Sequence, residues 1–144
     1  MIYTKMTILA MKTAYNAHLG QLDYNDVPYI FHPYHLAEQM DDEISCTVAL
    51  LHDVVEDTSL TFADLEQIFP KQVIEIVMLL THDEKVDYFD YIRKIKTNAI
   101  ATKVKLADIE HNSNEERSIG SNLSREQLLY WKEKYARAKE LLLP

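Results

Sequence analysis

Glycine and proline are scarce in this chain, with 2 glycines and 4 prolines among 144 residues. A fold made of tight hairpins needs these residues at its turns, so their scarcity favours helices joined by short connections. The single cysteine, Cys46, excludes an intrachain disulfide. Because Cys46 sits in the apolar run 44–51, we expect it to be a core residue and not a reactive thiol.

Long apolar runs are also missing. No segment approaches the roughly 20 apolar residues that a membrane-spanning helix requires. The opening residues, MIYTKMTILAMKTAYNAH, lack the apolar stretch and the small-residue cleavage site of a signal peptide. We therefore expect a cytoplasmic protein that does not interact with membranes.

Basic residues are outnumbered by acidic ones, which gives a formal charge of −8 and a pI of about 5.2. An acidic surface repels the phosphates of nucleic acid polymers, so these are not expected partners. A small phosphorylated substrate remains compatible if a metal and a local basic patch offset the charge. The length fits one domain, which we expect to fill residues 1–144.

Helical periodicity runs almost from end to end, and no stretch shows the alternation of a strand. A polar loop is expected between residues 19 and 28. The sequence predicts an all-α fold, a compact bundle of six or more helices. The predicted helices are 4–17, one that follows Pro33, 44–56, one capped by Thr61, one opened by Pro70, 88–96, 99–112 and one capped by Ser124.

The segment ALLHDVVEDT, residues 49–58, carries the most informative pattern. If it is helical, His52 and Glu56 share a side, as do Asp53 and Asp57. Burying such carboxylates beside a core without a cation would cost several kcal/mol. Histidine and aspartate suit Mn, Fe, Co or Zn. The alternative is a solvated acidic patch at the end of a helix, although the helix dipole disfavours it there; spacing alone leaves both open.

Further candidates lie in two other segments. His32 in PYIFHP and Asp108 in VKLADIEHNS are possible ligands. Taken alone, a histidine such as His32 is more often a structural core residue, and Asp108 could be a simple hydrogen-bonding residue. Lys103 and Lys105 precede Asp108 and are candidates for binding a phosphate group. The alternative for these lysines is a solvated helix surface.

Four segments, AHLGQ, PYIFHP, ALLHDVVEDT and VKLADIEHNS, occur in this order over residues 14–114. Together they resemble the signatures of the hydrolase domain of RelA/SpoT proteins and of small alarmone hydrolases. These belong to the HD-domain superfamily of metal-dependent phosphohydrolases. The resemblance implies an all-helical enzyme of the stringent response. Such an enzyme uses Mn²⁺, or another divalent transition metal, to remove the 3′-pyrophosphate from (p)ppGpp.

The resemblance also implies roles for individual residues. Glu56 and Asp57 match the catalytic acidic pair that orients and deprotonates the attacking water, and Asn112 would help to bind the nucleotide. Lys103 and Lys105 complete the proposed substrate-binding set. The implied metal ligands are His32, His52, Asp53 and Asp108.

Three positions depart from the family pattern. Asp23 and Tyr24 stand where an Arg-Lys pair usually follows GQ, and Ile109 replaces a basic residue. Arg117 is a candidate to replace part of the missing positive charge that would bind the nucleotide. The synthetase domain of the long RelA/SpoT proteins is not expected in a chain of this length.

Two other functions stay open. The same scaffold could act on another nucleotide or phosphate ester, such as a nucleoside monophosphate, as the change at Asp23 and Tyr24 indicates. A non-enzymatic helical module that binds a nucleotide or a partner protein is the third option. The pair Glu56 and Asp57 weighs against it, because a pure binding site needs no base. The oligomeric state is left open.

Overall fold

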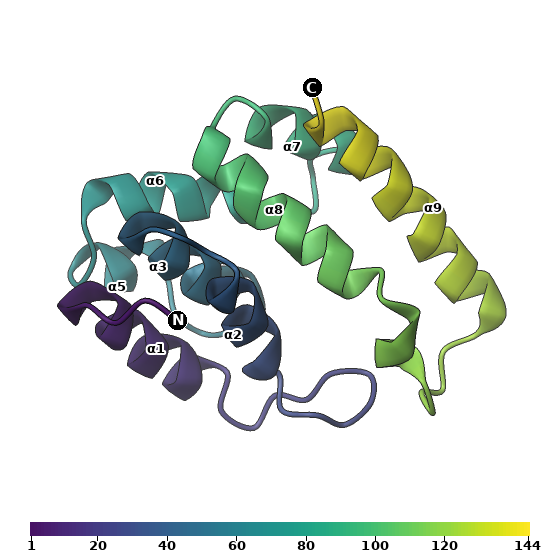
Figure 1. Ribbon diagram of the computed structural model, residues 1–144, viewed down its shortest axis with the longest axis horizontal. Helices are drawn as coiled ribbons and strands as arrows, with labels where there is room; N and C mark the ends of the chain where they lie inside the picture. Colours follow the sequence, from purple (N-terminus) through teal and green to yellow (C-terminus); the bar gives the residue numbers. More distant parts are fainter.

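The computed structural model describes all 144 residues and consists of helices joined by short loops, without a β-sheet (Figure 1). The predicted all-α fold is confirmed. The elements are α1 (Lys5–Ala17), α2 (Phe31–Glu38), α3 (Glu43–Leu51), α4 (Val54–Asp57), α5 (Phe62–Glu66), α6 (Lys71–Leu80), α7 (Tyr88–Ile95), α8 (Ala99–Asn112), the 3₁₀ turn η1 (Glu115–Ser118) and α9 (Arg125–Leu142).

Side-chain caps fix where several helices begin. The Thr4 hydroxyl accepts a hydrogen bond from the Thr7 N–H at the start of α1, and Thr61 forms a capping box at α5. The Ser124 hydroxyl accepts from the Gln127 N–H at α9. Each cap satisfies a backbone donor that the helix leaves unpaired, which stabilises the helix by about 1 kcal/mol.

Helix α3 forms the centre of the bundle. Every residue from Ser45 to Leu51 is buried, including Cys46. The helix packs against α1, α2, α6 and α8, so neighbours cover it on all sides (Figure 1). This explains a sequence that is apolar almost all round, and it anchors the residues that follow α3 in a rigid core.

The prediction of one continuous helix over residues 44–56 is wrong. Helix α3 ends at Leu51, His52 and Asp53 form a turn, and α4 begins at Val54. In a continuing helix the Ala49 carbonyl would accept from the Asp53 N–H. Here the His52 Nδ1 atom lies 2.6 Å from that carbonyl oxygen and takes its place. The histidine side chain thus competes with the backbone, and the chain turns at the two residues of the motif.

Helix α9 closes the bundle against α7 and α8 (Figure 1). One face of this helix is buried or half-buried, and its residues are Leu128, Trp131, Tyr135, Ala138 and Leu142. The loop between α1 and α2 reaches the same side of the molecule, where the Tyr24 ring lies 5.1 Å from the Trp131 ring. No helix combines the length and apolar character needed to cross a bilayer.

Candidate metal centre

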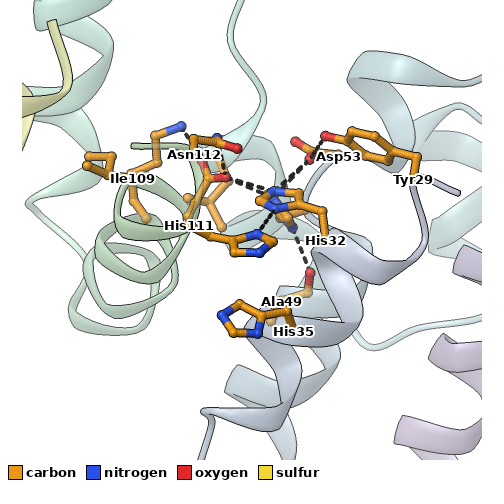
Figure 2. Close-up of polar contacts among 12 residues, drawn as sticks. Tyr29, His32, His35, Ala49, Asp53, Ile109, His111 and Asn112 are labelled. Atoms are coloured by element: carbon orange, nitrogen blue, oxygen red, sulfur yellow. Dashed lines mark hydrogen bonds and ion pairs between the residues drawn. The ribbon is translucent and has the colours of Figure 1, made fainter. Parts of the chain in front are cut away.

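Four side chains from three parts of the fold converge in one place (Figure 2). His32 comes from α2, His52 and Asp53 from the turn after α3, and Asp108 from α8. One nitrogen or oxygen atom from each lies within 4.8 Å of the others. The structure therefore brings together all four residues that the sequence motifs nominate as metal ligands.

The facing atoms are two imidazole nitrogens and two carboxylate oxygens. The Nε2 atom of His32 lies 2.9 Å from Asp108 Oδ1 and 3.6 Å from Asp53 Oδ2. The Nε2 atom of His52 lies 3.0 Å from Asp53 Oδ2 and 3.6 Å from Asp108 Oδ1. A metal bonded at about 2.1 Å to each ligand would hold neighbouring ligand atoms roughly 3 Å apart. These separations fit that requirement.

The orientation of His52 is fixed by the backbone. Its Nδ1 atom lies 2.6 Å from the Ala49 carbonyl oxygen, so Nδ1 carries the proton and donates it. The Nε2 atom is buried and has no hydrogen-bond partner, although Asp53 lies beside it. A buried nitrogen lone pair that faces a carboxylate is repelled unless a proton or a metal ion lies between them.

His32 is oriented by a second histidine. The Nδ1 atom of His32 lies 2.7 Å from Nδ1 of His111 on α8, which leaves His32 Nε2 facing the cluster (Figure 2). The ring of His35 stacks on the outer side of His111, with centroids 4.1 Å apart. The position of His111 in the sequence, three residues after Asp108, does not predict this contact with His32.

Tyr29 supports the ligand Asp53. Its hydroxyl donates a hydrogen bond of 2.6 Å to Asp53 Oδ2 (Figure 2). Burial and the adjacent Asp53 carboxylate raise the pKa of Tyr29, so the phenol stays protonated and remains a donor. This bond holds the carboxylate toward the two histidines.

The electrostatics of the cluster favour a positive charge at its centre. Burial opposes ionisation of Asp53, yet His52 and His32 lower its pKa to about 2. Burial would lower the pKa of His52, but the Asp53 and Asp108 carboxylates raise it well above the ordinary value. A proton attracted this strongly marks a place where a divalent cation would be stabilised. The donor set and its burial therefore fit a divalent metal ion.

Asp108 is held by two further side chains. The Lys105 ammonium donates to Asp108 Oδ2 at 2.8 Å, and the Asn112 amide donates to Oδ1 at 2.9 Å. Burial opposes ionisation of Asp108, but Lys105 and the two cluster histidines hold its pKa well below the usual range. Two of the three predicted substrate-binding residues, Lys105 and Asn112, thus lie at the cluster, where they also orient a ligand.

Lys103 does not join them. It lies five residues before Asp108 on α8, a rotation of about 140° around the helix axis. Its ammonium pairs with Asp41 on the exposed surface. Ile109, which replaces a basic residue of the family motif, is buried in the hydrophobic core. Neither position supplies a cation to the cluster.

Glu56 and Asp57 on α4 lie one helical turn after the ligand turn, and both reach solvent. Glu56 Oε1 accepts a hydrogen bond of 2.7 Å from the His82 backbone N–H. Partial burial and the Asp53 carboxylate raise the pKa of Glu56, which the His82 bond partly offsets. Partial burial and Asp53 also raise the pKa of Asp57. Two carboxyl groups with raised pKa values beside a cationic centre are suited to acid–base chemistry.

The negative charge of Asp23 is paired with neighbouring groups. Its Oδ2 atom lies 3.7 Å from Arg117 Nη2, and its Oδ1 atom accepts from the Asn25 N–H. The Arg117 Nη1 atom donates to Asn112 Oδ1 and to the His111 carbonyl, each at 3.1 Å. The Asn25 amide donates to the Arg117 carbonyl. These bonds join the loop between α1 and α2 to η1 and place a guanidinium at the edge of the cluster.

Comparisons with known proteins show which family the chain resembles. The family model described as the HD domain matches residues 10–114. The chain is 37% identical over 127 aligned positions to the bifunctional (p)ppGpp synthase/hydrolase SpoT of Escherichia coli K12, an alignment that covers 78% of this chain and 18% of SpoT. It is 37% identical over 101 positions to the guanosine-3′,5′-bis(diphosphate) 3′-pyrophosphohydrolase MESH1 of Danio rerio, covering 62% of this chain and 56% of MESH1.

A solved structure gives the same fold. It is described as a metazoan ortholog of SpoT that hydrolyzes ppGpp and plays a role in starvation responses. The two folds superpose with a TM-score of 0.76 at 24% identity, over 99% of this chain and 94% of the other. The chain spans about a fifth of SpoT and just over half of MESH1.

The family match stops at residue 114, before η1 and α9. That a single HD domain fills the whole chain therefore stays a prediction. Within residues 10–114 lie all the motif residues and the complete His/Asp cluster. The chain belongs to the HD-domain family.

Proposed function

We propose that this protein is a Mn²⁺-dependent pyrophosphohydrolase that removes the 3′-pyrophosphate from (p)ppGpp or a closely related nucleotide. One observation carries the proposal. A buried cluster of two histidines and two aspartates lies beside a pair of carboxyl groups, Glu56 and Asp57, whose pKa values are raised. A site that only binds a nucleotide has no need of such a pair.

The proposed ligands of the metal are the four members of the cluster, His32, His52, Asp53 and Asp108. Two nitrogen and two carboxylate donors suit a divalent transition metal, and manganese is the metal implied by the family resemblance. When bound, such an ion lowers the pKa of water and polarises a phosphoryl oxygen.

We assign to Glu56 the role of the general base that accepts a proton from the attacking water. Its second carboxyl oxygen is free to act because Oε1 is held by the His82 N–H. The raised pKa brings Glu56 closer to neutral pH, where a general base is most effective. Asp57 would orient the water from the neighbouring position on α4.

The substrate phosphates would meet cations at the edge of the cluster. We assign Asn112 and Lys105 to substrate binding, together with Arg117, whose guanidinium is held on the Asn112 side chain. SpoT and MESH1, the relatives compared above, carry names that specify (p)ppGpp hydrolysis, which supports a guanosine nucleotide as substrate.

The test separates metal binding from chemistry. With purified protein, Mn²⁺ and ppGpp, Asp53→Asn should lose bound metal and pyrophosphate release together. Glu56→Gln should keep the metal and lose at least about 100-fold in kcat. Glu66→Gln on α5, an exposed glutamate, serves as the matched control. Turnover close to that of the wild type in both Asp53→Asn and Glu56→Gln would overturn the proposal.

A second substrate class, the nucleoside monophosphates, is favoured by one observation. Asp23 lies 3.7 Å from Arg117 and offsets its charge, so the cluster offers less positive charge to a substrate with several phosphates. A panel of nucleoside mono-, di- and tetraphosphates under the same conditions distinguishes the two. Turnover confined to monophosphates would favour this second class over ppGpp.

A further inference from the structure

The ammonium group of Lys134 on α9 has no anionic partner. Its Nζ atom lies 4.1 Å from the centre of the Tyr88 ring and 5.7 Å from that of Tyr135. Lys132, two residues earlier, pairs with Glu115, but Lys134 forms no ion pair or hydrogen bond. The side chain is half-buried, so its charge is directed toward the aromatic rings of the bundle and not into open solvent.

These rings connect Lys134 to the candidate metal centre. Tyr88 lies edge-on to His82, whose backbone N–H holds Glu56, with centroids 5.8 Å apart. The ring of Tyr91 lies 5.8 Å from that of Tyr88. The Lys105 ammonium lies 5.3 Å from the centre of the Tyr91 ring and donates to Asp108. Lys134 and Lys105 therefore flank one aromatic wall beside the cluster.

The two ammonium groups lie over neighbouring rings of one aromatic wall, Lys134 over Tyr88 and Lys105 over Tyr91. Burial and the Lys105 charge lower the pKa of Lys134, while Glu56 opposes that change. The only carboxylate bonded to either ammonium is Asp108, which also faces His32 and His52. Two like charges over one aromatic wall are destabilising unless an anion offsets them.

Tyr88 supplies another unused donor at this wall. Its hydroxyl is buried and has no hydrogen-bond partner. The Tyr88 ring lies beside those of His82, whose backbone N–H holds Glu56, and Tyr91, over which the Lys105 ammonium lies. A buried hydroxyl without a partner is costly, and an incoming acceptor would remove that cost.

We propose that Lys134 binds a phosphate group of the substrate, and that Lys134, Lys105 and the Tyr88 hydroxyl together form an anion subsite on the Glu56 side of the cluster. This proposal rests on the proposed function, because it names the part of that site that receives a second phosphate. It also gives α9, which lies outside the family match, a direct part in binding.

Inorganic pyrophosphate, titrated calorimetrically into the Mn²⁺-loaded protein, is the probe. Lys134→Met keeps the apolar stem against Tyr88 and removes the charge. It should weaken pyrophosphate binding roughly tenfold, since a hydrogen bond to a charged group contributes about that factor. Lys134→Arg should bind nearly as well as the wild type. Lys139→Met, an exposed lysine on the same helix, should leave the affinity unchanged.

Equal pyrophosphate affinity in Lys134→Met and the wild type, at equal helical content by circular dichroism, would overturn the subsite. So would a wild-type protein that carries metal and binds no pyrophosphate. The hydrolase proposal is judged separately by turnover of ppGpp. An active wild type in which Lys134→Met has no effect on binding would therefore reject the subsite and leave the hydrolase in place.

Discussion

The imidazole rings of His32 and His111 lie nearly parallel, at 5°, and their Nδ1 atoms are 2.7 Å apart. This contact crosses from α2 to α8 and fixes which nitrogen of His32 faces the cluster. A partner of this kind sets both the tautomer and the orientation of a metal-binding histidine.

His111→Ala should therefore weaken metal binding by about 10- to 100-fold while the fold persists. The measurement is a competition titration of Mn²⁺ against a chelator of known affinity. His35→Ala, which removes only the ring stacked on the outside of His111, is the control and should retain the wild-type affinity. Identical metal affinities in the two variants would show that His111 does not orient the ligand.

Tyr29→Phe tests the hydrogen bond to Asp53. The bond is short, at 2.6 Å, and its acceptor is charged and largely buried, so losing the donor should lower the free energy of unfolding of the metal-free protein by about 1–3 kcal/mol. Urea unfolding measures this value. Tyr130→Phe, at an exposed position on α9, should cause no measurable change. A Tyr29→Phe protein as stable as the wild type would mean that Asp53 does not depend on this donor.

Activity should depend on pH through Glu56. Burial raises the pKa of Glu56, and the Asp53 charge adds to that effect. A general base acts only when it is ionised, so kcat should fall as pH drops through this raised pKa, earlier than for an ordinary glutamate. The profile would be recorded from about pH 5 to 8 at saturating metal. In Glu56→Gln the remaining activity should no longer show this fall of kcat at low pH. An unchanged fall would assign the ionisation to another group.

Arg117 should affect substrate binding more than chemistry. It donates to Asn112 and lies near Asp23, at the edge of the cluster. Arg117→Met should raise KM for ppGpp about tenfold and change kcat little, because one charge-assisted contact is lost in both the ground state and the transition state. Asp23→Asn, which frees the guanidinium, should not raise KM. A loss confined to kcat in Arg117→Met would place this arginine in the chemistry instead.

The fold and the ligand set follow from local sequence patterns. Scarce glycine, caps such as Thr61 and Ser124, and an apolar segment with no polar face predict buried and capped helices, and the structure has them. The break after Leu51 could not be predicted from periodicity. It depends on the His52 side chain reaching the Ala49 carbonyl, a contact that apolar spacing does not encode.

Contacts between elements that are distant in sequence could not be predicted either. His32 and His111 are 79 residues apart, and Asn25 and Arg117 are 92 apart. Neither pair shows a spacing that a single sequence could reveal. Lys103 was predicted from its closeness to Asp108 along the chain, but the helical rotation turns it away from the cluster, toward Asp41. No sequence pattern around Lys134, which lies on a different helix, indicates a role at the cluster.

The central claim is tested most directly by identifying the products formed from ppGpp by the purified protein with Mn²⁺, with Asp53→Asn in parallel. We predict GDP and pyrophosphate in equal amounts from the wild type and neither from Asp53→Asn. A wild-type protein that carries the metal and leaves ppGpp intact would contradict the proposed activity, while the HD-domain fold and its His/Asp cluster would still stand.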